Sequence, residues 1–182
     1  YCVQWYICNG QTDHLIETGI DLYKLPLQEK KDILCSCIYG IDIDIHAVEV
    51  AKFSLLIKLI EDETAPSVSE VVPILPDLGD NIQFGNSLVS QTELNGISGA
   101  NHQMMEIAPF DWSTINNGCG FDVIIGNPPY VNTEGMHALL PSAEVEIYKK
   151  KYKTSHKQFD KYFIFIEQAI NKINENGLVC YI

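Results

Sequence analysis

Short apolar runs and helical stripes alternate along most of this chain, a pattern that predicts an α/β fold. The clearest pair is an apolar run at 37–44 followed by a segment at 47–61, in which apolar residues recur every three or four positions. Strands that alternate with helices favour a mostly parallel sheet flanked by those helices. The remaining predicted elements are strands at 81–88, 121–125 and 178–182 and helices at 25–36, 144–153 and 159–173.

The segments outside these elements are predicted to be less regular. Residues 1–8 have the apolar pattern of the last turns of a helix that lacks its beginning. Residues 10–24 and 63–80 are polar or contain proline, and both are interpreted as irregular. Residues 89–120 form a long connection with little pattern.

The predicted strand at 121–125 stops abruptly in a rigid polar turn. Its run Val-Ile-Ile at 123–125 is typical of a buried parallel strand. Gly126 allows close approach of neighbouring backbone, and the two prolines that follow cannot continue a sheet ladder. Ligands of open α/β sheets bind at the carboxyl ends of the strands. We therefore expect the tetrad at 127–130 to lie at a ligand-binding edge.

The tetrad Asn127-Pro128-Pro129-Tyr130 carries groups suited to holding a planar amine. The Asn127 side-chain carbonyl and the Pro128 backbone carbonyl are both hydrogen-bond acceptors, and proline restricts its own backbone. Two converging acceptors would bind both hydrogens of an NH2 group and direct its lone pair toward an electrophile. Tyr130 offers an aromatic face on which a flat base can stack. Because Asn-Pro is also a common turn signal, the tetrad alone is compatible with a simple strand-terminating turn.

Acidic and small polar residues end two other predicted strands. A carboxylate at the end of the second strand of a nucleotide-binding sheet accepts hydrogen bonds from ribose hydroxyls, so Asp42 is the candidate for that role. Ile43 beside it is expected to pack against an adenine ring, whereas Asp44 is interpreted as the cap of the following helix. Asn86 is a candidate contact for the adenine of the cofactor. Each residue is also compatible with an ordinary role in a turn or cap.

Composition narrows the function classes. The net charge of −12, with no arginine, argues against a nucleic-acid-binding surface on this chain by itself. Six of the twelve lysines lie at 149–161, and this cluster is interpreted as a solvated face rather than a phosphate contact. The absence of a long apolar run and of a basic leader favours a cytoplasmic protein. The six cysteines lack Cys-x-x-Cys spacing, which favours free thiols and no metal site.

The order of these motifs resembles that of S-adenosylmethionine-dependent DNA adenine-N6 methyltransferases of the gamma class. The closest similarity is to the methylase part of single-chain type IIG restriction–modification enzymes, and it extends from about residue 25 to the end. The motifs that carry the resemblance are GIDID, NIQFGNSL, FDVIIGNPPYV, FDKYFIFIEQAI and NGLVCYI.

The resemblance implies a Rossmann-like methyltransferase fold, S-adenosylmethionine as methyl donor, and a target adenine flipped out of duplex DNA. Many relatives have Asp where Asn86 stands, so the cofactor contact of Asn86 is a point of departure from the family. Carried over to this chain, the expected catalytic residues are Asn127, Pro128, Pro129 and Tyr130. The expected cofactor-binding residues are Asp42, Ile43, Asn86, Ser87 and Phe165.

One motif of the family has no counterpart here. The glycine-rich first strand and turn, which holds the methionine part of the cofactor, would precede Tyr1. We therefore expect residues 1–182 to be one truncated catalytic domain that lacks its first strand, with 1–24 as lead-in and 25–182 as core. Such a piece is expected to be inactive by itself and to bind DNA weakly. Three other functions remain open: methylation of a protein glutamine amide, methylation of an RNA amine, and a catalytically silent scaffold.

Overall fold

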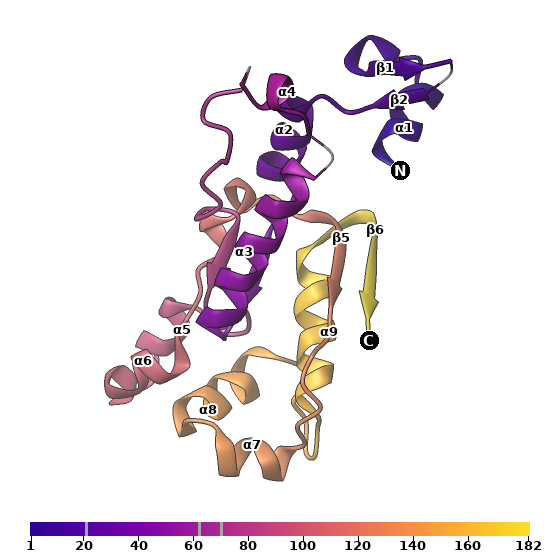
Figure 1. The fold of residues 1–182 in the computed structure, drawn as a ribbon. Helices are drawn as coiled ribbons and strands as arrows, with labels where there is room; N and C mark the ends of the chain where they lie inside the picture. The colour runs from indigo at the N-terminus through magenta and orange to yellow at the C-terminus, as the bar shows by residue number, and fades with distance from the viewer. Residues whose placement is uncertain (21, 62, 70) are drawn as a thin grey trace. The chain divides into compact units, whose positions relative to one another are not determined.

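The structure is a computed structural model that describes residues 1–20, 22–61, 63–69 and 71–182. The chain divides into two compact units. The first unit comprises Tyr1–Gly40 and His46–Ile82, and the second comprises Ile41–Ile45 and Gln83–Ile182. Helices and short strands succeed one another in both units, which confirms the α/β class (Figure 1). The prediction of a single domain stays a prediction.

The first unit is mainly helical and has its own apolar core. Its helices pack around the buried side chains of Leu27, Leu34, Val48 and Leu59. Lys30 and Lys24 both pair with the nearly buried Glu63, at 2.7 and 3.7 Å. The elements are α1 Cys2–Cys8, the 3-10 helix η1 Thr12–His14, β1 Ile16–Gly19, β2 Leu22–Lys24, α2 Leu27–Cys37, α3 Ile45–Ile60 and α4 Ala65–Ser69.

The second unit contains most of the predicted site. Its core is a cluster of buried residues from the segment around α5 and from α7, α8 and α9, with Leu88, Tyr148 and Ile164 fully buried. The helices are α5 Gln91–Asn95, η2 Ala100–Gln103, α6 Met104–Ile107, η3 Trp112–Thr114, η4 Asn116–Gly118, α7 Thr133–Leu139, α8 Ser142–Lys151 and α9 Lys161–Lys172. The strands are β4 Ile82–Phe84, β5 Phe121–Gly126 and β6 Ile173–Tyr181, and β3 Gly40–Asp42 precedes α3.

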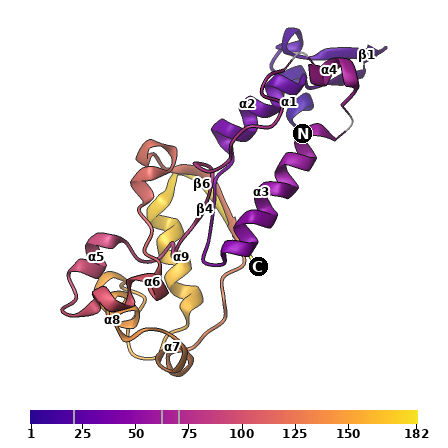
Figure 2. The same ribbon diagram turned by 60° about the vertical axis from the view of Figure 1, so that its left-hand side comes forward.

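The predicted strand before the tetrad is β5, which pairs in parallel with β6. The register aligns Val123 with Leu178 and Gly126 with Tyr181. Figure 2 shows α9 running alongside this pair, as Figure 1 does. Gly126 has a specific reason to be glycine, because an added Cβ would lie 3.2 Å from the Tyr181 ring. The close approach expected at Gly126 is therefore confirmed.

The strand β5 is less buried than its composition predicts. Val123 and Ile125 point to one face and are 58% and 76% exposed, whereas Ile124 is partly buried on the other face. The expectation of a fully buried strand was wrong for these residues. Within the second unit, β6 pairs with β5 at its edge and α9 runs alongside the pair, and this packing leaves Val123 and Ile125 exposed. Periodicity alone reports apolar character and cannot report which faces are covered.

Several boundaries also differ from the predictions. Residues 10–24, predicted as irregular, contain η1 and the antiparallel pair β1–β2, in which Ile16 aligns with Lys24. Residues 63–80 contain the short helix α4, and α7 was not predicted at all. Cys37 ends α2 instead of beginning a strand. These elements are short, and their stability depends on packing more than on local pattern.

The start of the last strand also differs from the prediction. The predicted helix at 159–173 is α9, which ends at Lys172, but β6 begins at Ile173 instead of 178 and so includes the dipeptide Asn176-Gly177. Asn176 has a positive φ of 67°, and the register between β5 and β6 shifts between Phe121 and Val123. The Asn-Gly signal therefore marks an irregularity inside a strand, which such dipeptides also permit.

Membrane and metal features were searched over the described ranges. None of the helices there is long and apolar enough to cross a bilayer. No group of three or more His, Cys, Asp or Glu side chains in those ranges is placed to hold a metal ion. All six cysteines are free thiols.

Candidate active site at the end of strand β5

The tetrad lies directly after β5, as its sequence predicted. The strand ends at Gly126, whose carbonyl accepts a hydrogen bond from Ile182 N at 3.1 Å. Pro128 is buried, whereas Asn127 and Tyr130 are exposed, Tyr130 to 70%. A buried proline between two exposed polar side chains anchors the turn and leaves its acceptor and its ring available to a ligand.

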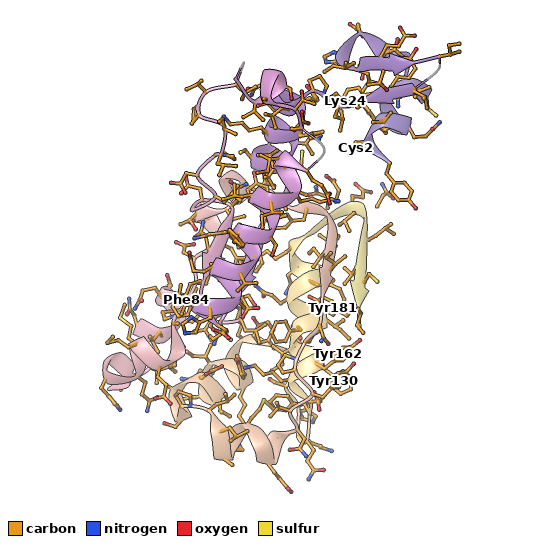
Figure 3. The ribbon with its side chains drawn as sticks, in the orientation of Figure 1. Cys2, Lys24, Phe84, Tyr130, Tyr162 and Tyr181 are labelled. Carbon is orange, nitrogen blue, oxygen red and sulfur yellow. The ribbon has the colours of Figure 1, made fainter. Side chains whose placement is uncertain are left out.

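The Tyr130 ring stacks on Tyr162, near the start of α9. Their centroids are 5.4 Å apart and the ring planes differ by 9°. The edge of Tyr162 in turn meets Tyr181 of β6, with centroids 6.3 Å apart at 65°. Figure 3 shows the labelled rings of Tyr181, Tyr162 and Tyr130 following one another beside α9. Aromatic side chains of α9 and β6 thus form a row of rings that begins at Tyr130 of the tetrad.

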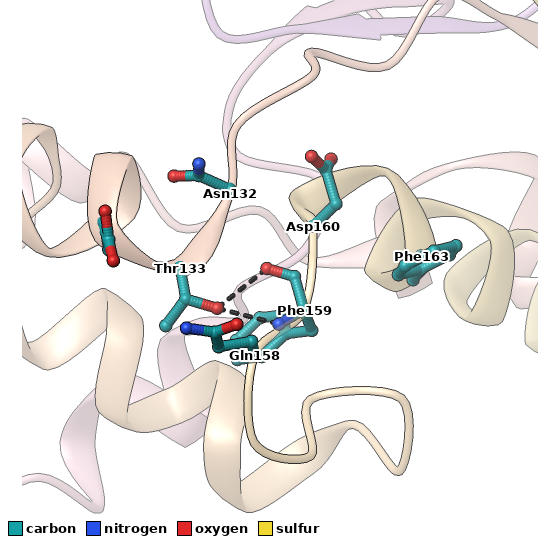
Figure 4. Close-up of a pocket in the computed structure, with 7 residues that line it drawn as sticks. Asn132, Thr133, Gln158, Phe159, Asp160 and Phe163 are labelled. Atoms are coloured by element: carbon teal, nitrogen blue, oxygen red, sulfur yellow. Dashed lines mark hydrogen bonds between the residues drawn. The ribbon is translucent and has the colours of Figure 1, made fainter.

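Backbone and hydroxyl hydrogen bonds join the segment after the tetrad to the start of α9. Lys161 N donates to Val131 O at 2.8 Å. The Thr133 hydroxyl donates to the Phe159 carbonyl and accepts from the Phe159 amide, both at 2.8 Å (Figure 4). Asn132 forms an isolated antiparallel bridge with Asp160. This seam holds the tetrad and the first turn of α9 together.

Two of the seam residues also cap helices. Asn132 Oδ1 accepts from Gly135 N at 2.9 Å at the start of α7, and Asp160 Oδ1 accepts from Tyr162 N at 2.9 Å at the start of α9. Our prediction missed both caps, although Asn and Asp before a helix are recognised N-cap signals. Beside the seam lies a pocket of about 280 Å³ (Figure 4). Its lining residues are Asn132, Thr133, Glu134, Gln158, Phe159, Asp160 and Phe163.

Two predicted cofactor residues lie at the ends of neighbouring strands. Asp42 ends β3, and its carbonyl accepts a hydrogen bond from Gly85 N at 2.8 Å. Gly85 has a positive φ, and a Cβ there would lie 3.0 Å from Phe110, so glycine is needed next to Asn86. The structure therefore brings the end of β3 beside the turn that carries Asn86.

The Asp42 side chain is exposed and already accepts one hydrogen bond. Its Oδ1 lies 2.8 Å from Asp44 N, so the carboxylate closes its own turn. Ile43 in the same turn is 54% exposed. Asp44 directly precedes α3, the position expected for a cap. An ionised carboxylate has further lone pairs, which leaves Asp42 with acceptors for a ligand.

Asn86, by contrast, is buried and engaged inside the protein. Its Nδ2 donates to Glu144 Oε1 at 3.0 Å, and its Oδ1 accepts from Leu88 N at 3.1 Å. The Asn86 side chain also forms a hydrogen bond with the Tyr148 hydroxyl. The cofactor contact of Asn86 stays a prediction, and its packing shows an additional structural role.

Glu144 is the centre of this buried network. It is 3% exposed, and the same Oε1 atom accepts from Asn86, from the Tyr148 hydroxyl and from Lys161 Nζ, the last at 3.3 Å. Burial and the neighbouring Glu144 carboxylate raise the pKa of Tyr148 well above its ordinary value. The sequence carries no specific signal for this role, because a glutamate in the first turn of a helix is common on surfaces.

The last two predicted residues are held by main-chain contacts. The Ser87 carbonyl accepts from Trp112 Nε1 at 2.8 Å and from Gln168 Nε2 at 3.1 Å. Phe165 on α9 is partly buried against the core of the second unit, and its carbonyl accepts from the Tyr181 hydroxyl at 3.3 Å. The main chain of both residues is therefore tied to neighbouring elements by hydrogen bonds.

Together these features define an α/β protein with polar residues at or just after the ends of β3, β4 and β5, the usual place for a ligand in such folds. Comparison with known proteins gives the family. Residues 36–182 match the Eco57I restriction-modification methylase family, and the chain belongs to it.

Named relatives agree with this assignment. A type II restriction enzyme and methyltransferase, RM.Eco57I from Escherichia coli, is 44% identical over 180 residues, which are 99% of this chain and 17% of the relative. A putative enzyme of the same description from Methanocaldococcus jannaschii is 37% identical over 82 residues, 45% of this chain and 7% of the relative. The type II methyltransferase M.PaeR7I from Pseudomonas aeruginosa is 34% identical over 62 residues, 34% of this chain and 10% of the relative. The chain thus spans a small part of each.

Proposed function

We propose that this chain is part of the catalytic domain of a DNA methyltransferase of a restriction–modification system, which methylates the N6 amine of adenine with S-adenosylmethionine. The observation that carries the proposal is the exposed Asn127 amide and Tyr130 ring directly after β5. Membership of the methylase family and the names of the relatives support methyl transfer and DNA as substrate. They favour DNA over a protein amide or an RNA amine.

The tetrad would hold the target base by its amine and its ring. The Asn127 Oδ1 atom and the Pro128 carbonyl are acceptors for the two hydrogens of an exocyclic NH2 group. Tyr130 would stack on the base, because its ring is largely exposed. Such contacts act most strongly as positive charge develops on the amine nitrogen, so they lower the barrier more than they increase binding.

The residues at the ends of β3 and β4 fit the nucleoside part of the cofactor. S-adenosylmethionine, when bound, supplies an electrophilic methyl group on sulfur. Asp42 presents an exposed carboxylate with acceptors left for ribose hydroxyls, and the exposed Ile43 offers an apolar surface for the adenine. Asn86 is proposed to border the adenine, while its buried side chain is held by Glu144 and Tyr148. Ser87 and Phe165 are proposed to line the same pocket.

The test is Asn127→Ala in the complete natural polypeptide that contains this chain. We expect single-turnover methylation to fall roughly a hundredfold or more, as for the loss of one donor or acceptor that acts at the transition state. DNA affinity should change little. The matched control is Asn95→Ala at the exposed end of α5, where the side chain accepts a hydrogen bond from Gln91 of the same helix at 2.9 Å.

Nucleoside analysis of the methylated DNA completes the test. N6-methyladenine as the product supports the proposal, whereas N4-methylcytosine would show that the target base is cytosine. Near-normal methylation by the Asn127→Ala protein would exclude the proposed role of the tetrad. Equal loss in the Asn95→Ala control would show that the assay reports folding instead of chemistry.

A further inference from the structure

Tyr130 stacks on Tyr162, a contact that is not needed for Tyr130 itself to stack on a base. An exposed tyrosine normally samples several rotamers, yet the parallel contact with Tyr162 favours one of them. Tyr162 covers one face of the Tyr130 ring, and Tyr130 nevertheless keeps 70% of its surface exposed. One face is therefore backed by protein, while the remaining surface is open to solvent.

Tyr162 is itself held from several sides. Its amide is bound by the Asp160 carboxylate that caps α9, at 2.9 Å. Its ring meets Tyr181 edge-on, with centroids 6.3 Å apart, and Phe163 at the same centroid distance. The adjacent Lys161 N is bonded to Val131 O, one residue after Tyr130. Contacts within α9 and with β6 thus hold Tyr162, and the bond to Val131 holds the chain next to Tyr130.

We propose that Tyr162 is a positioning residue that backs Tyr130 and so presents the open face of that ring to an extrahelical base. The inference rests on the proposed function and adds a residue to it. Because the ring is oriented before DNA arrives, less conformational entropy is lost when the base stacks. The aromatic ring of Tyr162 supplies this effect, and its hydroxyl is not needed.

If the base bound the other face of the Tyr130 ring, the effect of removing Tyr162 on DNA affinity would have the opposite sign. If the base had to take the face that Tyr162 occupies, the Tyr162 ring would compete with the base, and its removal would tighten binding. The sign of the change therefore distinguishes a backing residue from a blocking one. An unchanged affinity would mean that the stack has no part in base binding.

The experiment uses Tyr162→Leu and Tyr162→Phe in the complete natural polypeptide. The substrate is a duplex that carries the methylation site, mapped first by sequencing methylated plasmid DNA. We expect Tyr162→Leu to raise KM for this duplex roughly three- to tenfold, the range that an aromatic pair contributes, with little change in kcat. Tyr162→Phe should behave like the unaltered protein.

A second measurement tests whether Tyr162 acts through Tyr130. In a Tyr130→Leu background, adding Tyr162→Leu should cause no further rise in KM, because nothing remains to be backed. A duplex with 2-aminopurine at the target position reports stacking of the flipped base directly. We expect weaker quenching of its fluorescence with Tyr162→Leu than with Tyr162→Phe. If the leucine variant fails to fold, Tyr162→Met replaces it, since methionine also removes the ring.

The outcomes separate the two proposals. Unchanged or lower KM for Tyr162→Leu, or an equal effect of this change in the Tyr130→Leu background, overturns the positioning role. If Asn127→Ala is inactive in the same experiment, the proposed function stands and only the further inference fails. If Asn127→Ala remains active, the proposed function fails, whatever Tyr162→Leu does.

Discussion

At the residue scale, Asp42 combines a structural hydrogen bond with the proposed ribose contact. Its Oδ1 accepts from Asp44 N, so removing the side chain affects both the turn and the cofactor. We expect Asp42→Ala to weaken S-adenosylmethionine binding by about 1.5–3 kcal/mol, as for a hydrogen bond to a charged group. Asp42→Asn keeps an acceptor for the Asp44 amide and isolates the loss of charge. Calorimetric titration of the complete polypeptide measures both, and unchanged affinity in both variants would assign Asp42 to the turn alone.

Glu144 is the residue whose loss is expected to destabilise the second unit most. Removal of a buried carboxylate leaves Lys161, Asn86 and Tyr148 without their shared acceptor. We expect Glu144→Ala to lower the local free energy of unfolding by about 3–5 kcal/mol, the range for one partner of a buried ion pair. Hydrogen exchange of peptides from α8 measures this change.

The same helix offers the control for this experiment. Glu146 is exposed and pairs with Lys150 at 2.7 Å on the helix surface. Glu146→Ala should cost about 0.5 kcal/mol or less, because exposed pairs contribute little. Equal exchange rates in the two variants would contradict the importance of the buried network.

At the scale of elements, Glu167 of α9 holds the loop that follows α8. Its carboxylate accepts from Lys153 N, Thr154 N and the Thr154 hydroxyl, at 2.7–3.0 Å. Burial by itself would raise the pKa of Glu167, but these hydrogen bonds outweigh it and hold the pKa below its ordinary value. A lowered pKa means that the contact stabilises the folded protein above the unfolded pKa, about 4.3, and that this contribution is lost as the pH falls through the lowered value.

A neutral isostere tests this pH dependence. We expect faster amide exchange at residues 153–156 in Glu167→Gln than in the unaltered protein at pH 7. The difference in protection should narrow below about pH 4, where the native carboxyl group also becomes neutral. A difference that stays constant over this range would show that the charge of Glu167 does not hold the loop.

At the scale of the whole molecule, the net charge argues against DNA binding by this chain alone. The net charge is −12, and three lysines of the cluster at 149–161 pair with glutamates at 2.7–3.3 Å. These pairs are Lys150–Glu146, Lys151–Glu93 and Lys161–Glu144. Lys150 is largely exposed, whereas Lys151 and Lys161 are 25% and 13% exposed, so the interpretation as a solvated face does not fit Lys161. The pairs still argue against a phosphate contact, because paired lysines release fewer counterions from DNA.

We therefore expect the 182-residue chain to bind duplex DNA weakly when it is expressed alone. Fluorescence anisotropy with a labelled duplex should give a dissociation constant of about 10⁻⁴ M or weaker at physiological salt, at the weak end of non-specific binding. The complete polypeptide serves as the comparison. Micromolar binding by the chain alone, falling steeply with salt, would show that the lysine cluster is a DNA contact.

Local sequence determined the position of the tetrad and of the longest helices. A β-branched run followed by glycine and two prolines specifies a strand and its end without help from distant residues, and β5 ends at Gly126 accordingly. Long apolar stripes likewise predicted α3 and α9 to within a few residues. Asp42 was correctly placed at a strand end for the same reason.

The tertiary structure alone decided which side chains meet. The bond between Asn86 and Glu144 joins residues 58 positions apart, and the stack of Tyr130 on Tyr162 joins a turn to a helix. It also decided that Val123 and Ile125 are exposed, although their composition is that of a core. These long-range contacts, and the exposure of each strand face, depend on how helices and strands that are distant in sequence pack together. Propensity and periodicity act over a few residues and carry no information about these distant partners.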